Sequence, residues 1–185
     1  MAEDLSVMWD KASVPAAATA VVKRIEGFFA SPYDDNGSLP GGTWTIGYGT
    51  IRDAAGDPIT SATPPITESQ AVTLLMRDMN GAAEDVRQRV QVPLLTREAA
   101  SLISWTYNLG GTNLAKSTML ARINADMKGA VPDEMRKWIN QEGKPLLGLL
   151  RRRWAEAAIF VGLAPDNACV RAWKEIESLH DWPSF

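Results

Sequence analysis

RIEGFFASPYDDNGSLPGGTWTIGYGT, residues 24–50, combines the end of a helical pattern, a glycine-rich corner and a strand pattern in one short stretch. Glu26 stands where the apolar helical pattern ends, and Asp35 follows nine positions later. The stretch therefore predicts two carboxylates close to a tight turn of the chain.

Upstream of this corner, residues 13–30 predict a helix because Val21, Val22 and Ile25 recur at helical spacing. Ser13 is the expected N-cap, Pro15 suits the first turn, and Pro32 is expected to end the helix.

Downstream, residues 43–51 alternate as a strand does. One face carries Trp44, Ile46 and Tyr48, and the nearly bare other face carries Thr43, Thr45, Gly47 and Gly49. The missing side chains would leave room for a bulky ligand, although the glycines could equally permit close packing or a bulge.

From residue 67 onward the pattern stays helical. Thr67 and Gln70 predict a capping box at the start of a helix of about six turns. Thr96 is expected to cap the next helix, which Gly110 and Gly111 close. Further helices are predicted in residues 117–126, 132–139, 145–160 and 167–179. The predicted fold class is α+β and mostly helical, with a small N-terminal β-hairpin lobe and a larger helical lobe flanking a cleft.

The two carboxylates suggest acid and base chemistry. Glu26 lies at a helix C-terminus beside Phe28 and Phe29, and both features would favour a protonated carboxyl near neutral pH. Asp35, in a polar setting, is expected to be ionised. Glycoside hydrolysis uses such a pair: one group protonates the leaving oxygen while the other activates water or attacks the sugar. The hydroxyl of Thr45 could hold a water or a sugar, but chance spacing would produce the same residues.

Composition excludes several classes of function. The net charge of −3 and the pI of about 5.2 argue against nucleic-acid or anionic-membrane binding through bulk electrostatics. Arg151, Arg152 and Arg153 are interpreted as the solvated face of a helix. A single cysteine, Cys169, and a single histidine, His180, offer neither a disulfide nor a metal-ligand set, so no metal or cofactor is expected.

The N-terminal residues 1–15 lack the basic and apolar regions of a signal peptide. No apolar run approaches the roughly 18 residues of a membrane span. We expect a monomer made in the cytoplasm, without integral membrane association.

The stretch also carries a family resemblance. Glu26-Gly27, Tyr33 seven positions after Glu26, Asp35 nine after it and Thr-Ile-Gly-Tyr-Gly at 45–49 resemble the phage-type lysozymes, or endolysins, of glycoside hydrolase family 24. Residues 101–124 and 148–160 look like the central helix and the later arginine-rich helix of that family, so the likeness runs from about residue 16 to residue 160.

The resemblance implies a lysozyme-like fold and a muramidase that cleaves the β-1,4 bond between N-acetylmuramic acid and N-acetylglucosamine in bacterial peptidoglycan. By it, Glu26 is the general acid, Asp35 positions water or stabilises the oxocarbenium-like transition state, and Thr45 orients the water. An inverting course is implied, with the carboxyl groups roughly 6.5 to 9.5 Å apart. Tyr107 and Asn108 match positions near the cleft of the family and are expected to contact substrate, although Tyr107 could equally be a buried ring.

The route to the wall that the resemblance implies is release from the host cytoplasm after a holin opens the membrane.

The chain departs from the family in one place. Nine residues separate Asp35 from Thr45, where the family usually has five, which predicts a longer loop at the rim of the cleft. Thr43 is a second candidate for the threonine role, and Asp34 is expected to be a solvated loop residue. The loop also leaves open a different class of function, a catalytically inactive module that binds glycan or protein.

The expected domain organisation is a lysozyme-like muramidase domain in residues 1–163 and a C-terminal helical extension, 164–185, packed on it. Trp173 and Trp182 in the extension could pack against the domain or stack on wall saccharide.

Overall fold

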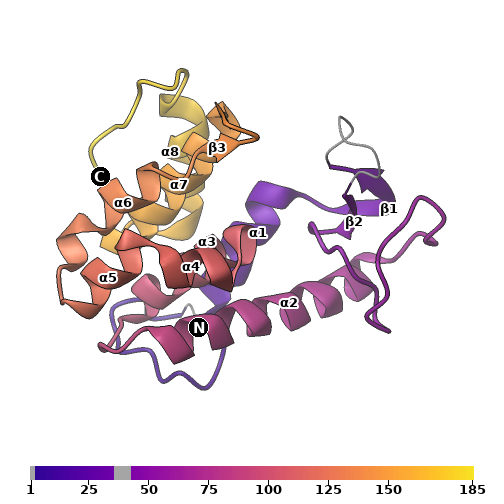
Figure 1. Ribbon diagram of the computed structural model, residues 1–185, viewed down its shortest axis with the longest axis horizontal. Coiled ribbons are helices and arrows are strands. Elements are labelled where there is room, and N and C mark those ends of the chain that lie inside the picture. Colours follow the sequence, from indigo (N-terminus) through magenta and orange to yellow (C-terminus); the bar gives the residue numbers. More distant parts are fainter. Residues whose placement is uncertain (1–2, 36–42) are drawn as a thin grey trace.

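The computed structural model describes residues 3–35 and 43–185 as a small hairpin lobe beside a larger helical lobe (Figure 1). The elements are α1 (Ala16–Glu26), β1 (Phe29–Asp34), β2 (Trp44–Gly47), α2 (Glu68–Arg89), α3 (Thr96–Leu109), α4 (Gly111–Lys116), α5 (Thr118–Asn124), a 3₁₀ turn η1 (Lys128–Ala130), α6 (Val131–Arg136), β3 (Asn140–Gln141), β4 (Lys144–Pro145), α7 (Leu147–Val161) and α8 (Pro165–Glu175). The predicted α+β class is confirmed. Within the described ranges no helix is both long and apolar enough to cross a bilayer.

Helix α1 begins later and ends earlier than the sequence predicts. Ser13 does not cap it: the carboxylate of Glu3 accepts the N–H groups of Ala16 (3.0 Å) and Ala17 (2.9 Å). Gly27, at φ +70°, ends the helix directly after Glu26, well before Pro32. A positive φ suits glycine, and the chain leaves the helix at this point and enters β1 with Phe29.

The hairpin of β1 and β2 pairs Tyr33 with Thr45 and Asp34 with Trp44. The N–H of Asp35 donates to the carbonyl of Thr43 (3.0 Å), which continues the pairing. Asp34 is exposed, as expected, but it belongs to the strand and not to the loop. The predicted longer loop lies outside the described residues.

The strand face that the sequence leaves bare has two different uses. A Cβ on Gly47 would lie 3.0 Å from the Cβ of Ala71, so Gly47 lets β2 pack closely against α2. A Cβ on Gly49 would instead meet Oε2 of Glu26 at 3.5 Å and the hydroxyl of Tyr107 at 3.7 Å. Only the second glycine opens space beside the predicted site.

Helix α2 runs from the hairpin lobe to the helical lobe (Figure 1) and has the predicted capping box. The hydroxyl of Thr67 accepts the N–H of Gln70 (3.2 Å), and the amide oxygen of Gln70 accepts the N–H of Thr67 (2.8 Å). The expected cap of the next helix is wrong: Thr96 is already helical, and its hydroxyl donates to the carbonyl of Val7 (3.1 Å).

The centre of the helical lobe is α3, which packs on α1, α2 and α7. Its side chains Leu102, Ile103 and Trp105 are completely buried. This burial fixes the far end of α3, with Tyr107 and Asn108, opposite the end of α1.

The last residues of the chain return to the domain after α8. The indole of Trp154 donates to the carbonyl of Pro183 (2.8 Å), and the ring of Phe185 stacks on it with centroids 5.5 Å apart. Trp182 is half-buried against Phe185, whereas Trp173 is 43% exposed. The packing interpretation therefore holds for Trp182 and is wrong for Trp173, and the domain division at residue 163 stays a prediction.

Candidate active site

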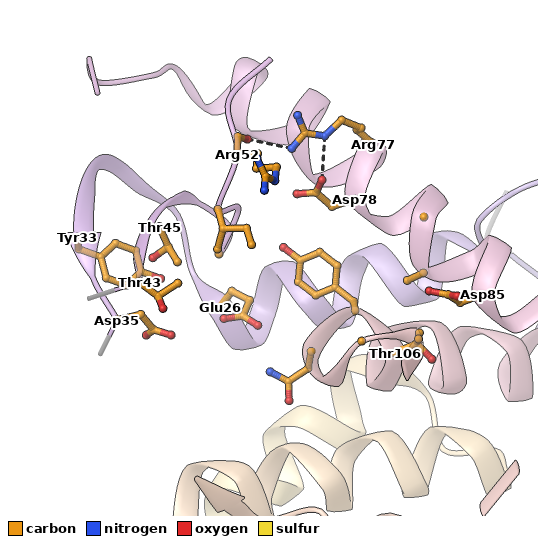
Figure 2. A pocket seen from close by; sticks show the side chains of 18 residues that line it. Glu26, Tyr33, Asp35, Thr43, Thr45, Arg52, Arg77, Asp78, Asp85 and Thr106 are labelled. Carbon is orange, nitrogen blue, oxygen red and sulfur yellow. Dashed lines mark hydrogen bonds and ion pairs between the residues drawn. The ribbon is translucent and has the colours of Figure 1, made fainter. Parts of the chain in front are cut away.

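A cleft of about 570 Å³ lies between the hairpin and the helical lobe. All five residues singled out in the sequence line it: Glu26, Asp35, Thr45, Tyr107 and Asn108. Figure 2 shows Glu26 in the middle of this cleft, with Asp35 and Thr45 on the hairpin side. Residues from α1, the hairpin and α3, separate in sequence, thus share one cavity.

The carboxylate of Glu26 does not have the apolar surroundings that the sequence predicts. Phe28 and Phe29 are 38% and 47% exposed. Instead the guanidinium of Arg152, on α7, donates to Oε1 of Glu26 in an ion pair whose arginine side chain is 4% exposed. Burial alone would lower the pKa of Arg152, but the charges of Glu26 and Glu156 hold it above its ordinary value.

The interpretation of the arginine run as a solvated face is therefore wrong. Arg152 and Arg153 are both buried, and Glu156 lies between them. Nε of Arg152 is 3.2 Å from Oε1 of Glu156, and Nε of Arg153 is 2.8 Å from Oε2. The hydroxyl of Ser104 also donates to Oε1 of Glu156 (2.8 Å). Burial lowers the pKa of Arg153 to about 10, which still leaves it charged at neutral pH.

Together with Glu26 these residues form a buried charge cluster of two cations and two anions: Arg152, Arg153, Glu156 and Glu26. Buried charges are tolerated when they are paired in this way. The cluster fixes the direction of Glu26, because Oε1 is held by Arg152 while Oε2 points toward Gly49, where a Cβ would lie 3.5 Å from it.

The two α3 residues take different positions. Tyr107 is half-buried, and its hydroxyl donates to the carbonyl of Tyr48 (2.8 Å), which joins α3 to the turn after β2. Burial is the main reason why the pKa of Tyr107 is raised. Asn108 is exposed at the cleft, and its Oδ1 accepts a hydrogen bond from Arg153 (2.9 Å). This bond turns the amide nitrogen of Asn108 away from the charge cluster.

Asp35 sits at the edge of the cleft beyond β1. The residue as a whole is exposed, but its carboxyl lies against the cleft wall, and the loss of water there raises its pKa. The negative charges of Glu26 and Asp34 raise the pKa of Asp35 further. The polar setting expected for Asp35 thus includes two neighbouring carboxylates, Glu26 and Asp34, and its ionised state stays a prediction.

Two threonines line the cleft on the same strand face as Asp35. Thr45 is buried and lies opposite Tyr33, whereas Thr43 is exposed and lies opposite Asp35. Both are visible beside Asp35 in Figure 2. The geometry brings both candidates for the threonine role into the cleft.

A polar group at the other end of the cleft was not predicted from the sequence. Arg77 donates to Asp78 (2.8 Å) and to the carbonyl of Arg52 (2.9 Å), and Asp78 accepts the hydroxyl of Thr50 (2.7 Å). These residues fix the loop after β2 to helix α2, as the dashed lines in Figure 2 show for Arg77.

The residues missed at the centre of the site are Arg152, Arg153 and Glu156. The sequence carries one usable signal for them. Glu156 follows the two arginines at four and three positions, and those spacings put charges of opposite sign on one side of a helix. The otherwise apolar composition of residues 154–160 indicates that this side is buried.

Comparison with known proteins gives consistent matches. Residues 23–156 match the family model described as phage lysozyme, and this range includes every site residue discussed above. An endolysin of Acyrthosiphon pisum secondary endosymbiont phage 1 is 30% identical over 76% of this chain and 92% of its own length. The solved endolysin from Escherichia coli O157:H7 phage FAHEc1 has a TM-score of 0.72 and 32% identity, covering 81% of this chain and 94% of that one. The muramidase domain of SpmX from Asticaccaulis excentricus has a TM-score of 0.69 and 26% identity, covering 82% and 99%.

Proposed function

Because the chain belongs to the phage lysozyme family, we propose that it hydrolyses the β-1,4 bond between N-acetylmuramic acid and N-acetylglucosamine in bacterial peptidoglycan by two-carboxylate catalysis. It is a glycoside hydrolase of the lysozyme type. The observation that carries the proposal is that the two oxygens of Glu26 have different surroundings. Oε1 is bound by Arg152, and Oε2 points toward Gly49 in the cleft that Asp35 also lines.

In the proposed mechanism Glu26 takes up a proton at Oε2, while Arg152 keeps Oε1, and delivers this proton to the leaving oxygen as the glycosidic bond breaks. Arg152 is a positioning residue, since it holds Oε1 and so limits the directions that Oε2 can take. Asp35, ionised, orients a water molecule against the anomeric carbon, stabilises positive charge on the sugar and accepts the proton that the water loses as its oxygen bonds to that carbon. Gly49 leaves the space that the sugar needs beside Oε2.

The test of this reaction is digestion of purified sacculi followed by identification of the new reducing ends. We expect muropeptides that end in reducing N-acetylmuramic acid and, for an inverting course, the α-anomer as the first product. Reducing N-acetylglucosamine ends would instead indicate a glucosaminidase. A folded protein that binds sacculi but releases no fragment would replace the proposal with a glycan-binding module.

The water-orienting role is proposed for Thr45, with Thr43 as its matched control. Thr45→Val keeps the shape and removes the hydroxyl, and we expect hydrolysis about 100-fold slower, as for other single donors at reacting centres. Thr43→Val should change the rate little. The reverse pattern in steady-state rates on sacculi would assign the role to Thr43.

The raised pKa of Asp35 predicts the acidic limb of the activity profile. Asp35 must be ionised to act, so activity should fall, as the pH decreases, at a pH above the ordinary aspartate value of 3.8. Asp34→Asn removes one of the charges that raise this pKa and should move the limb to lower pH. The measurement is kcat/KM on sacculi against pH for both proteins. A limb that stays in place in Asp34→Asn contradicts the assignment to Asp35.

We further propose that the protein acts in phage lysis, made in the host cytoplasm and admitted to the wall by a holin. Support comes from the similarity to phage endolysins. Induced expression should lyse cells only when a holin is co-expressed. Lysis without one would contradict this route.

A further inference from the structure

A second hollow of about 430 Å³ lies between α1 and α8, lined by Arg24, Cys169, Val170, Trp173 and Lys174. We call it the α1–α8 groove. It shares no residue with the active-site cleft. Arg24 and Glu26 are two positions apart on α1, which is roughly 200° around a helix, so the groove and the cleft open on nearly opposite sides of α1.

The groove exposes apolar surface that the fold leaves uncovered. Trp173 and Val170 are 43% and 50% exposed. All seven tryptophans lie in the described ranges, and Trp173 is the most exposed of them, although the chain end after α8 folds back and covers Trp154. Exposed tryptophans in hollows are frequent anchors of binding sites.

The same groove is positively charged. Within the described residues neither Arg24 nor Lys174 forms an ion pair, whereas the neighbouring Arg171 is bound to Glu175 (2.8 Å). Burial raises the pKa of the Cys169 thiol to about 11, so the floor of the groove carries no negative charge at neutral pH. This local cationic surface stands on a chain whose net charge is −3.

An aromatic face that shares a groove with two cations free of ion pairs fits a sugar whose substituents carry carboxylates. Peptidoglycan has this chemistry, because its pyranose rings bear acidic lactyl-peptide groups. We propose that the α1–α8 groove is a second glycan-binding site, in which a peptidoglycan strand lies on Trp173 with carboxylates at Arg24 and Lys174. The proposal rests on the proposed function for the choice of ligand. A second contact on one polymer raises the effective concentration of substrate at the cleft without adding a contact there.

The test measures binding separately from hydrolysis. Binding to intact sacculi is followed by co-sedimentation in a Glu26→Gln background, so the polymer is not digested. We expect Trp173→Ala to weaken binding about tenfold, the usual size of a tryptophan anchor. Arg24→Gln combined with Lys174→Gln should weaken binding and reduce its dependence on salt. Val161→Ala and Lys144→Gln, which remove exposed groups elsewhere, serve as matched controls and should bind normally.

Unchanged sacculus binding by Trp173→Ala, with an unchanged Tm, would overturn the proposal. The proposal would also be overturned by a groove variant that still binds sacculi but no longer binds phosphatidylglycerol vesicles. The same holds for a groove variant that still binds sacculi but no longer forms a dimer in size-exclusion chromatography. If the wild-type protein, with Glu26 intact, releases no muropeptides, the proposed reaction is contradicted, but the binding experiment on the groove variants is not affected.

Discussion

Glu26→Gln is expected to slow the hydrolysis of sacculi at least about 1,000-fold, within the range for loss of a general acid. Glutamine keeps the shape of the side chain, and its amide oxygen can still accept the hydrogen bond from Arg152. The group facing the space beside Gly49 then becomes an amide nitrogen, which cannot release a proton to a leaving oxygen. The measurement is the initial rate of muropeptide release at matched protein concentration.

Glu84→Gln is the control for this substitution. Glu84 is an exposed glutamate on α2 that faces Arg87 at 3.2 Å, outside the cleft lining. It should leave the rate of muropeptide release unchanged. Because Glu26→Gln also removes one anion from the buried cluster, its Tm has to be measured beside its rate. A folded Glu26→Gln protein that retains more than about a tenth of the wild-type rate would exclude Glu26 as the general acid.

The parts of the fold that the sequence predicts well depend on contacts that are local in sequence. The two residues of the capping box, Thr67 and Gln70, are three positions apart, and the helix that follows them has the predicted extent. The start of α1 depends instead on Glu3, thirteen residues before Ala16. Ser13 is favoured by residue propensity because it directly precedes the helical pattern. Propensity carries no information about a carboxylate that comes from a distant segment of the chain.

The candidate site divides in the same way. Glu26 and Asp35 lie within one short motif, and the structure brings them to one cleft as predicted. Arg152 is 126 residues from Glu26, so no local pattern could reveal their ion pair. The wrong prediction for residues 151–153 has the same cause. Their charge alone favours a solvated helix face, whereas Glu26 and Glu156 compensate the charge of the arginines and so allow them to be buried.

Glu156→Gln is expected to destabilise the protein by about 3 to 5 kcal/mol, as when one member of a buried ion pair is removed. Its side chain is fully buried, and its carboxylate is the shared partner of Arg152 and Arg153. The substitution leaves Glu26 as the one anion of the cluster against two buried guanidinium groups. For a chain of this size the loss corresponds to a fall in Tm of roughly 6 to 20 °C.

Glu175→Gln is the matched control, because it breaks a solvent-exposed pair with Arg171 and should leave the Tm nearly unchanged. Comparing the Tm values of the two variants separates the effect of unbalancing the buried charges from the effect of losing any glutamate.

If Glu156→Gln unfolds at the wild-type temperature, the stability of the cluster does not depend on its charge balance. If it is destabilised as expected but hydrolyses sacculi normally well below its Tm, then Arg152 positions Glu26 without help from Glu156. A fall in both Tm and rate would instead indicate that the four charges of the cluster act as one unit, with α7 holding Glu26, the proton donor on α1, in place.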